Sequence, residues 1–121
     1  MERQLWHVER QTLLAPRLRW CCSFGSKLRG LTFRRQISQD EGIVLVEEGE
    51  GRALTAVHML FVFCNLAIIW VNSQGEIVDT ALGRPWRPAY IPRRPAQYVI
   101  ELHPDWLTQL QPGDHIQFHK L

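Results

Sequence analysis

The chain has only three cysteines, which is too few for a disulfide framework. Cys21 and Cys22 are adjacent, and neighbouring residues on a strand point to opposite faces, so we do not expect them to bond to each other. The opening MERQLWHVER is charged throughout and lacks the apolar run of a secretory signal peptide. These features favour free cysteines and a reducing, cytoplasmic location.

Strong net charge is also missing, since the formal charge is only +2, but the charges are unevenly spread. Residues 1–35 carry eight Lys and Arg against two Glu, whereas residues 40–50 carry five acids and no base. A basic segment of this kind is one hypothesis for nucleic-acid binding. We favour the alternative that the two blocks face each other or water, so nucleic acid is not the expected partner.

The segment 56–71, AVHMLFVFCNLAIIWV, contains no Asp, Glu, Lys or Arg. A membrane span needs about 20 mostly apolar residues, and a span here would place His58 and Asn65 in hydrocarbon. Half of the segment is β-branched or aromatic, which favours strands over a buried helix. We therefore predict two buried strands, over about 57–63 and 66–72, with a turn or bulge between them.

The rest of the sequence has many short apolar runs between turn residues, and no repeat or low-complexity tract. The predicted strands are 5–10, 12–22, 43–47, 76–82, 96–102 and 115–119, and the predicted helices are 23–31 and one or two turns that begin at Pro104. Seven or eight short strands at this spacing indicate a mainly β, single-domain β-sandwich or barrel with one or two short helices. We expect it to be a monomer.

Several short motifs follow one another in a recognisable order. They are RGL at 29–31, EGIVLV at 41–46, VHM at 57–59, LAIIWVNSQGEIV at 66–78, PWRP at 85–88, VIEL at 99–102 and GD at 113–114. Their order and spacing, over about residues 11–119, resemble the bacterial and archaeal family called domain of unknown function 192. The resemblance implies a small all-β domain with a jelly-roll-like sandwich and no established activity.

The chain departs from the pattern of that family after the central methionine. Many relatives carry a Lys–Asn pair there and an Asp before the next strand, where this chain has Leu60, Phe61 and Ala67. If that polar series forms an active site in relatives, this chain has lost it.

Catalytic and metal-binding motifs are scarce. His115 and His119 are four residues apart, which on the predicted strand is about 13 Å and too far for one zinc ion. There is no nucleophile elbow, phosphate loop or dinucleotide-binding glycine pattern. Nothing in the sequence ties together the carboxylates Glu76, Asp79 and Glu101. We therefore expect no metal and no cofactor, and we favour a protein that is not an enzyme.

The candidate ligand-binding residues are His58, Trp86, Arg87 and Arg29. The segment 84–95, RPWRPAYIPRRP, is a stiff basic arm whose Trp86 is either a binding residue or an anchor packed on the domain. His58 is either a hydrogen-bonded core residue or lies at a pocket rim near this arm. Two functions remain open: a non-catalytic binding or accessory module for a small molecule or protein partner, or a small enzyme with His58 as general acid or base.

Overall fold

The structure is a computed structural model that describes residues 2–23, 30–31 and 33–120. Its strands are β1 (Glu2–His7), β2 (Thr12–Cys21), β3 (Glu41–Gly51), β4 (Leu66–Val71), β5 (Ile77–Gly83), β6 (Ala96–Leu102) and β7 (Ile116–Lys120), and η1 (Pro104–Thr108) is a single 3₁₀ turn. The mainly β fold is thus confirmed. No helical segment in the described part of the chain is long and apolar enough to cross a membrane.

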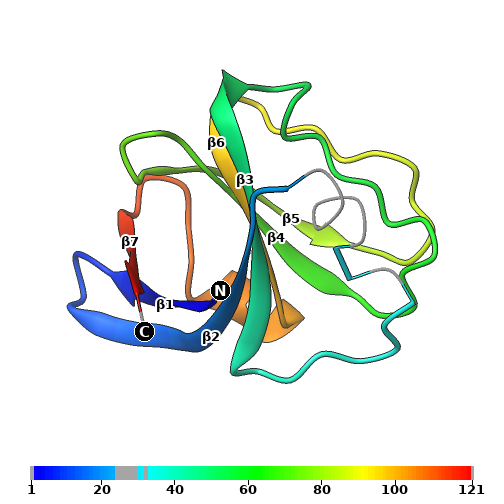
Figure 1. The fold of residues 1–121 in the computed structure, drawn as a ribbon, viewed down its shortest axis with the longest axis horizontal. Helices are drawn as coiled ribbons and strands as arrows, with labels where there is room; N and C mark the ends of the chain where they lie inside the picture. Colours follow the sequence, from blue (N-terminus) through cyan, green and yellow to red (C-terminus); the bar gives the residue numbers. More distant parts are fainter. Residues whose placement is uncertain (1, 24–29, 32, 121) are drawn as a thin grey trace.

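The seven strands form one curled sheet, which makes a half-barrel (Figure 1). The strand order is β5-β4-β6-β3-β2-β1-β7, and every pair is antiparallel except β2 with β3. An isolated bridge between Glu76 and His115 joins the chain just before β5 to the chain just before β7. The backbone N–H of Ile77 also donates to the carbonyl of Asp114 at 2.8 Å. The curl therefore brings the two outer strands together at one end.

Strand β4 is buried on both of its faces, which explains why its sequence shows no alternation. Ala67, Ile69 and Val71 point into a first core cluster enclosed by the curl of the sheet. Leu66, Ile68 and Trp70 point the other way, into a second core cluster that the long connections cover. Figure 1 shows these connections, coloured cyan, green and yellow, on the side of the central strands away from β1 and β7.

The predicted strand 57–63 is wrong, because only Val57 forms a β-bridge, with Tyr90. The segment is neither buried throughout, as β4 is, nor buried at every second residue: Val57, Met59 and Val62 are buried while Phe61 and Phe63 are exposed. Spacings of two and then three residues between the buried positions break the period of a strand and require a turn. The segment is therefore a loop that inserts three apolar anchors into the second core cluster.

The turns between strands follow the local sequence. In the predicted NSQG turn, the Asn72 side-chain oxygen accepts hydrogen bonds from the backbone of Gln74 and Glu76, and Gly75 has a φ of 84°. His103 caps η1 by accepting a hydrogen bond from the backbone N–H of Asp105. The predicted helix over 23–31 falls mainly on residues 24–29, which lie outside the described residues.

Candidate functional site

Three loop segments, 33–34, 59–63 and 86–87, are joined by backbone hydrogen bonds over the second core cluster, and we call them together the loop layer. The backbone N–H of Phe33 donates to the carbonyl of Phe61 at 2.6 Å, and that of Phe63 donates to the carbonyl of Arg34 at 3.0 Å. On the other side, the N–H of Met59 donates to the carbonyl of Arg87 at 2.8 Å. The loops therefore form a hydrogen-bonded layer rather than three independent connections.

Four aromatic side chains on this layer form a continuous exposed patch, which we call the aromatic surface: Phe33, Phe61, Phe63 and Trp86. Ring centroids are 5.7 Å apart between Phe33 and Phe61, 4.9 Å between Phe61 and Trp86, and 5.7 Å between Phe63 and Trp86. The four residues are 39–70% exposed, and Leu60 beside them is 37% exposed. A contiguous apolar patch of this kind is typical of an interaction site, whereas single exposed apolar residues are ordinary.

The backbone conformation also singles out the aromatic surface. Phe33, Phe61 and Trp86 have φ values of 66°, 60° and 69°, in the left-handed region that bulky residues rarely adopt. Each such residue costs about 1–2 kcal/mol, and such costs concentrate at functional sites. Three of the four non-glycine residues with positive φ in the described chain belong to this one patch, which makes it the leading candidate site.

The aromatic surface has a basic margin. The segments 33–36, 60–63 and 84–88 contain four arginines and no Asp or Glu. Arg34 forms an ion pair with Glu41, and the guanidinium of Arg35 lies 5.6 Å from the centre of the Phe63 ring. Arg84 and Arg87 are exposed and form no ion pair with the carboxylates that the structure describes. The patch is thus positioned to receive a negatively charged ligand.

The structure brings three of the four predicted candidate residues to the same region. Trp86 belongs to the aromatic surface, Arg87 lies next to it, and His58 lies on the neighbouring loop segment, paired through Met59. Arg29 lies outside the described residues. The interpretation of His58 as a core residue is wrong: its side chain is exposed, and its Nδ1 accepts a hydrogen bond from the backbone N–H of Leu60.

The positions where relatives are expected to be polar do not form one site in this chain. Leu60 and Phe61 lie at the surface, whereas Ala67 is fully buried in the first core cluster. Phe33, Phe61 and Phe63 are members of the site that the sequence did not predict. The only signal available was their position beside turns, because nothing local predicts that three distant loops will pair.

Substitution of His58 and of Trp86 by alanine should cost little stability. We expect His58→Ala to change the free energy of unfolding by less than about 0.5 kcal/mol, as is usual for exposed residues. Trp86→Ala should cost about 1 kcal/mol, because half of the indole is exposed and the rest contacts Phe61 and Phe63. Urea unfolding of both variants tests this. A loss of about 3 kcal/mol for Trp86→Ala would instead identify it as a packed anchor.

Polar groups also lie beneath the loop layer. Glu101 is 5% exposed, and its neighbours across the sheet are Ile43 on β3 and Ile68 on β4. Burial raises the pKa of Glu101 to about 7, and the nearby Arg19 opposes that rise. Burial likewise raises the pKa of the Cys64 thiol, which disfavours the reactive thiolate. All three cysteines are free.

The other carboxylates considered from the sequence do not join Glu101. Glu76 lies 3.8 Å from a guanidinium nitrogen of Arg94, and Asp79 accepts a hydrogen bond from the backbone N–H of Arg93. Glu76, just before β5, and Asp79, on β5, therefore both contact the end of the 84–95 arm and hold it against this strand. Their partners assign them a structural role rather than that of a catalytic pair.

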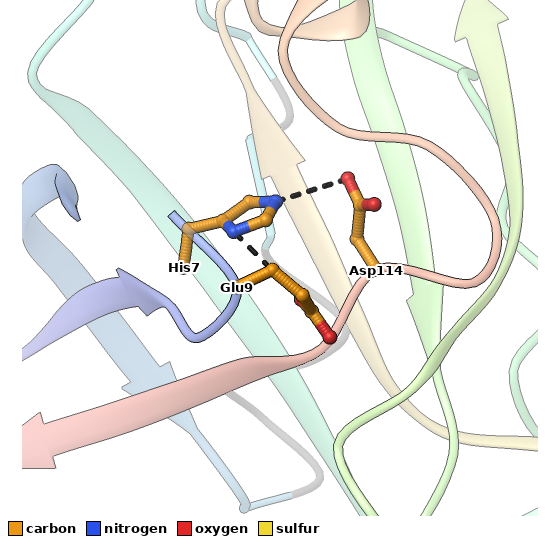
Figure 2. Close-up of side chains that lie close together, drawn as sticks. All are labelled: His7, Glu9 and Asp114. Carbon is orange, nitrogen blue, oxygen red and sulfur yellow. Dashed lines mark hydrogen bonds and ion pairs between the residues drawn. The ribbon is translucent and has the colours of Figure 1, made fainter. Parts of the chain in front are cut away.

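Among the residues that the structure describes, one group could offer three metal ligands: His7, Glu9 and Asp114 (Figure 2). Nδ1 of His7 accepts from the backbone N–H of Arg10 and lies 3.8 Å from Glu9, while Nε2 lies 3.0 Å from the Asp114 carboxylate. One ligand atom from each of the three residues lies within 4.8 Å of the others, and both ring nitrogens of His7 already have partners in the chain. The geometry suits a hydrogen-bonded clamp that holds β1 to the turn before β7.

The chain matches known proteins over most of its length. The model of the family DUF192, described as "Uncharacterized ACR", matches residues 8–118. A UPF0127 protein of Pyrococcus furiosus is 30% identical over 106 residues, which are 86% of this chain and 88% of that protein. A UPF0127 protein of Thermococcus kodakarensis is 33% identical over 79 residues, 65% of this chain. The match spans 48% of that longer relative, about half its length.

Two crystal structures share the fold. A protein from Sinorhizobium meliloti 1021, proposed to be a transcription regulator, superposes with a TM-score of 0.83 at 22% identity, over 97% of this chain and 92% of the other. A protein of unknown function from Novosphingobium aromaticivorans gives a TM-score of 0.79 at 16% identity, over 97% of this chain and 84% of the other. At these identities the likeness concerns the fold alone.

Proposed function

This chain belongs to the DUF192 family, and we propose that it is a non-catalytic binding domain that holds a short acidic and apolar segment of a partner protein on its aromatic surface. The observation that carries the proposal is the contiguous exposure of four aromatic side chains, three of them in left-handed backbone conformations. Large exposed apolar patches with a polar rim are typical of protein interaction sites.

The residue types at the surface suit a protein ligand. Trp and Arg are enriched among the residues that carry most of the binding energy at protein interfaces. The backbone of the surface is held by hydrogen bonds between loops, so it is already ordered before a partner arrives. Such preorganisation reduces the entropy cost of binding. The basic residues Arg84, Arg87 and Arg35 at the margin favour a segment that contains Asp or Glu.

Nucleic acid fits the surface less well. Single-stranded nucleic acid is held by ring faces on which successive bases stack. Here the ring planes of Phe61 and Trp86 are inclined by 59° and those of Phe63 and Trp86 by 67°, so the rings pack against one another at steep angles instead of presenting parallel faces. The basic residues of segment 1–35 are also dispersed: Arg3 lies over Trp20, and Arg10 donates to Gln109. The Sinorhizobium meliloti protein is described as a proposed transcription regulator, so binding of nucleic acid is the alternative function that the experiment must also test.

A selection experiment tests the proposal with defined probes. A random dodecapeptide display library would be selected against the wild-type domain, and the enriched peptides would be titrated against a Phe61→Ser, Trp86→Ala double variant. We expect enriched peptides with aromatic or aliphatic residues next to Asp or Glu, and binding weakened by about tenfold or more in the variant. Arg87→Glu should weaken the same peptides by reversing the charge at the margin.

The matched control is Leu13→Ser, which removes an apolar side chain that is 43% exposed on β2. It should leave peptide binding unchanged. The proposal fails if the selection enriches no peptide, or if enriched peptides bind the double variant as tightly as the wild type. It also fails if a labelled oligothymidylate, rather than any peptide, binds the wild type and is lost in the double variant.

A further inference from the structure

The buried carboxyl group of Glu101 lies between the sheet and the loop layer. Its side chain is on the same side of β6 as Val99, which belongs to the second core cluster, and the residue is 5% exposed. Its cross-strand neighbours Ile43 and Ile68 are members of the same cluster, together with Met59 from the loop layer. The carboxyl group accepts no hydrogen bond from the residues that the structure describes. A negative charge at this position is therefore poorly solvated.

The charged and titratable groups around Glu101 come from β2 and from the loops. Arg19 on β2 lies in the same cross-strand row, two strands away, and its positive charge only partly opposes the effect of burial. Cys64 directly follows the loop layer, and the charge of Glu101 disfavours ionisation of its thiol, whereas Arg34 favours it. The cross-strand neighbours on β3 and β4 are uncharged isoleucines. The surroundings thus favour the protonated form of Glu101 while the loop layer is closed.

The loop layer is a weaker cover than the sheet beneath it. Strand β6 is paired along its length with β3 on one side and β4 on the other. The loop layer is held by single backbone hydrogen bonds between its segments, and its residues Phe33, Phe61 and Trp86 have positive φ values that bulky residues rarely adopt. Regions of this kind open locally at a lower free energy than the whole protein unfolds. Opening of the loop layer is therefore the easiest way for water to reach Glu101.

We propose that Glu101 makes the loop layer a pH-sensitive cover for the second core cluster. While the carboxyl group carries its proton, the layer is closed and the rings of the aromatic surface keep their arrangement. Loss of the proton stabilises a locally open form in which water reaches the carboxylate and the rings are no longer held together. Binding at the aromatic surface should therefore weaken as the pH rises, and this last consequence alone rests on the proposed function.

Amide hydrogen exchange, corrected for the intrinsic pH dependence of the exchange reaction, tests the opening without a ligand. The reporters are the backbone N–H groups of Met59, Phe63 and Trp86, which donate hydrogen bonds within the layer. The pKa of Glu101 is about 7 in the closed form and should return to its ordinary value of 4.5 in the open form. The opening constant should then rise, and the protection of these amides fall, by roughly 70-fold from pH 5 to pH 8.

Two comparisons assign this change to Glu101 and to the loop layer. Glu101→Gln has a similar shape and cannot ionise, so its loop-layer amides should be equally protected at pH 5 and pH 8. Glu48→Gln, the same change at an exposed position of β3, should keep the full pH dependence. The amides of β4, which is buried along its whole length, should be better protected than those of the layer at every pH, because their exchange requires global unfolding.

Binding supplies a second readout. Peptides selected on the aromatic surface at pH 6 should bind the wild type more weakly at pH 8, whereas their binding to Glu101→Gln should change less. Titration of the peptide or of the exposed His58 is common to both proteins, so the difference between them reports on Glu101. If no peptide is enriched, the proposed function fails, and hydrogen exchange still decides whether the cover exists.

Three results would overturn the proposal. Protection of the loop-layer amides that is the same at pH 5 and pH 8 in the wild type would show that their opening does not expose Glu101. An equal fall in Glu101→Gln would assign the effect to another group. Loop-layer amides as well protected as those of β4 would show that the layer opens only when the whole protein unfolds. If Glu101→Gln does not fold, Glu101→Leu, which also lacks a titratable group, takes its place.

Discussion

Trp70→Ala is expected to lower the free energy of unfolding by about 4 kcal/mol, measured by urea denaturation. Trp70 is the largest of the fully buried side chains in the described chain, with 1% of its surface exposed. It fills the second core cluster between β4 and the loop layer. Its indole N–H also donates to the carbonyl of Thr55 at 2.7 Å, so the substitution leaves both a cavity and a buried acceptor without its donor.

Two comparisons give this result its meaning. Trp70→Phe keeps most of the apolar volume but loses the hydrogen bond to Thr55, and should cost about half as much as Trp70→Ala. Trp86→Ala deletes the same atoms from a residue that is 48% exposed, and should cost about 1 kcal/mol. If the two Trp→Ala variants lost equal stability, the description of loops anchored on one side and exposed on the other would be wrong.

The bounds of a strand were predictable where residues that interrupt strands flank it. Strand β6 has the predicted bounds, 96–102, because AQYVIEL lies between a proline and the His103–Pro104 start of η1. Strand β4 was predictable for a different reason. A continuous apolar run bounded by the NSQG turn is typical of a strand that is covered on both faces, and β4 is such a strand.

The loop over 57–63 was not predictable, because composition cannot distinguish a buried strand from a loop with buried anchors. Val57 and Met59 are buried as a strand would require, but the positive φ of Phe61 then turns the chain. That conformation is stabilised by hydrogen bonds from Phe33 and Trp86 to this loop, and both donors are more than 20 residues away in the sequence. Local propensity contains no information about such partners.

The same limit applies to the candidate site. Trp86 and Arg87 could be predicted because an aromatic residue and arginines between prolines are unusual on any chain. Phe33 and Phe61 could not, since each is an ordinary apolar residue until the loops pair. The alternation of β6 puts Glu101 on the same side of the sheet as Gln97 and Val99, and Val99 belongs to the second core cluster, which the loop layer covers. A buried carboxyl group results.

This burial predicts that the stability of the protein depends on pH through Glu101. The pKa of Glu101 is about 7 in the folded chain against an ordinary value of 4.5, because burial disfavours the charged form. Well below pH 4.5 the carboxyl group is protonated in both the folded and the unfolded chain, so its burial does not reduce the free energy of unfolding. Between pH 4.5 and 7 the unfolded chain loses its proton while the folded chain keeps it, so stability falls as the pH rises, and it levels off above 7.

Glu101→Gln should therefore stabilise the protein at pH 8 by up to roughly 3 kcal/mol relative to its effect at pH 4, since each pKa unit corresponds to about 1.4 kcal/mol. Urea unfolding of the wild type and the variant at pH 4, 5, 6, 7 and 8 measures that difference. Glu48→Gln, the same change at an exposed position on β3, is the control and should show no such trend. A stability difference between Glu101→Gln and the wild type that stays constant from pH 4 to pH 8 would show that Glu101 is ionised in water-like surroundings. The loop layer would then not exclude solvent from this side of the sheet.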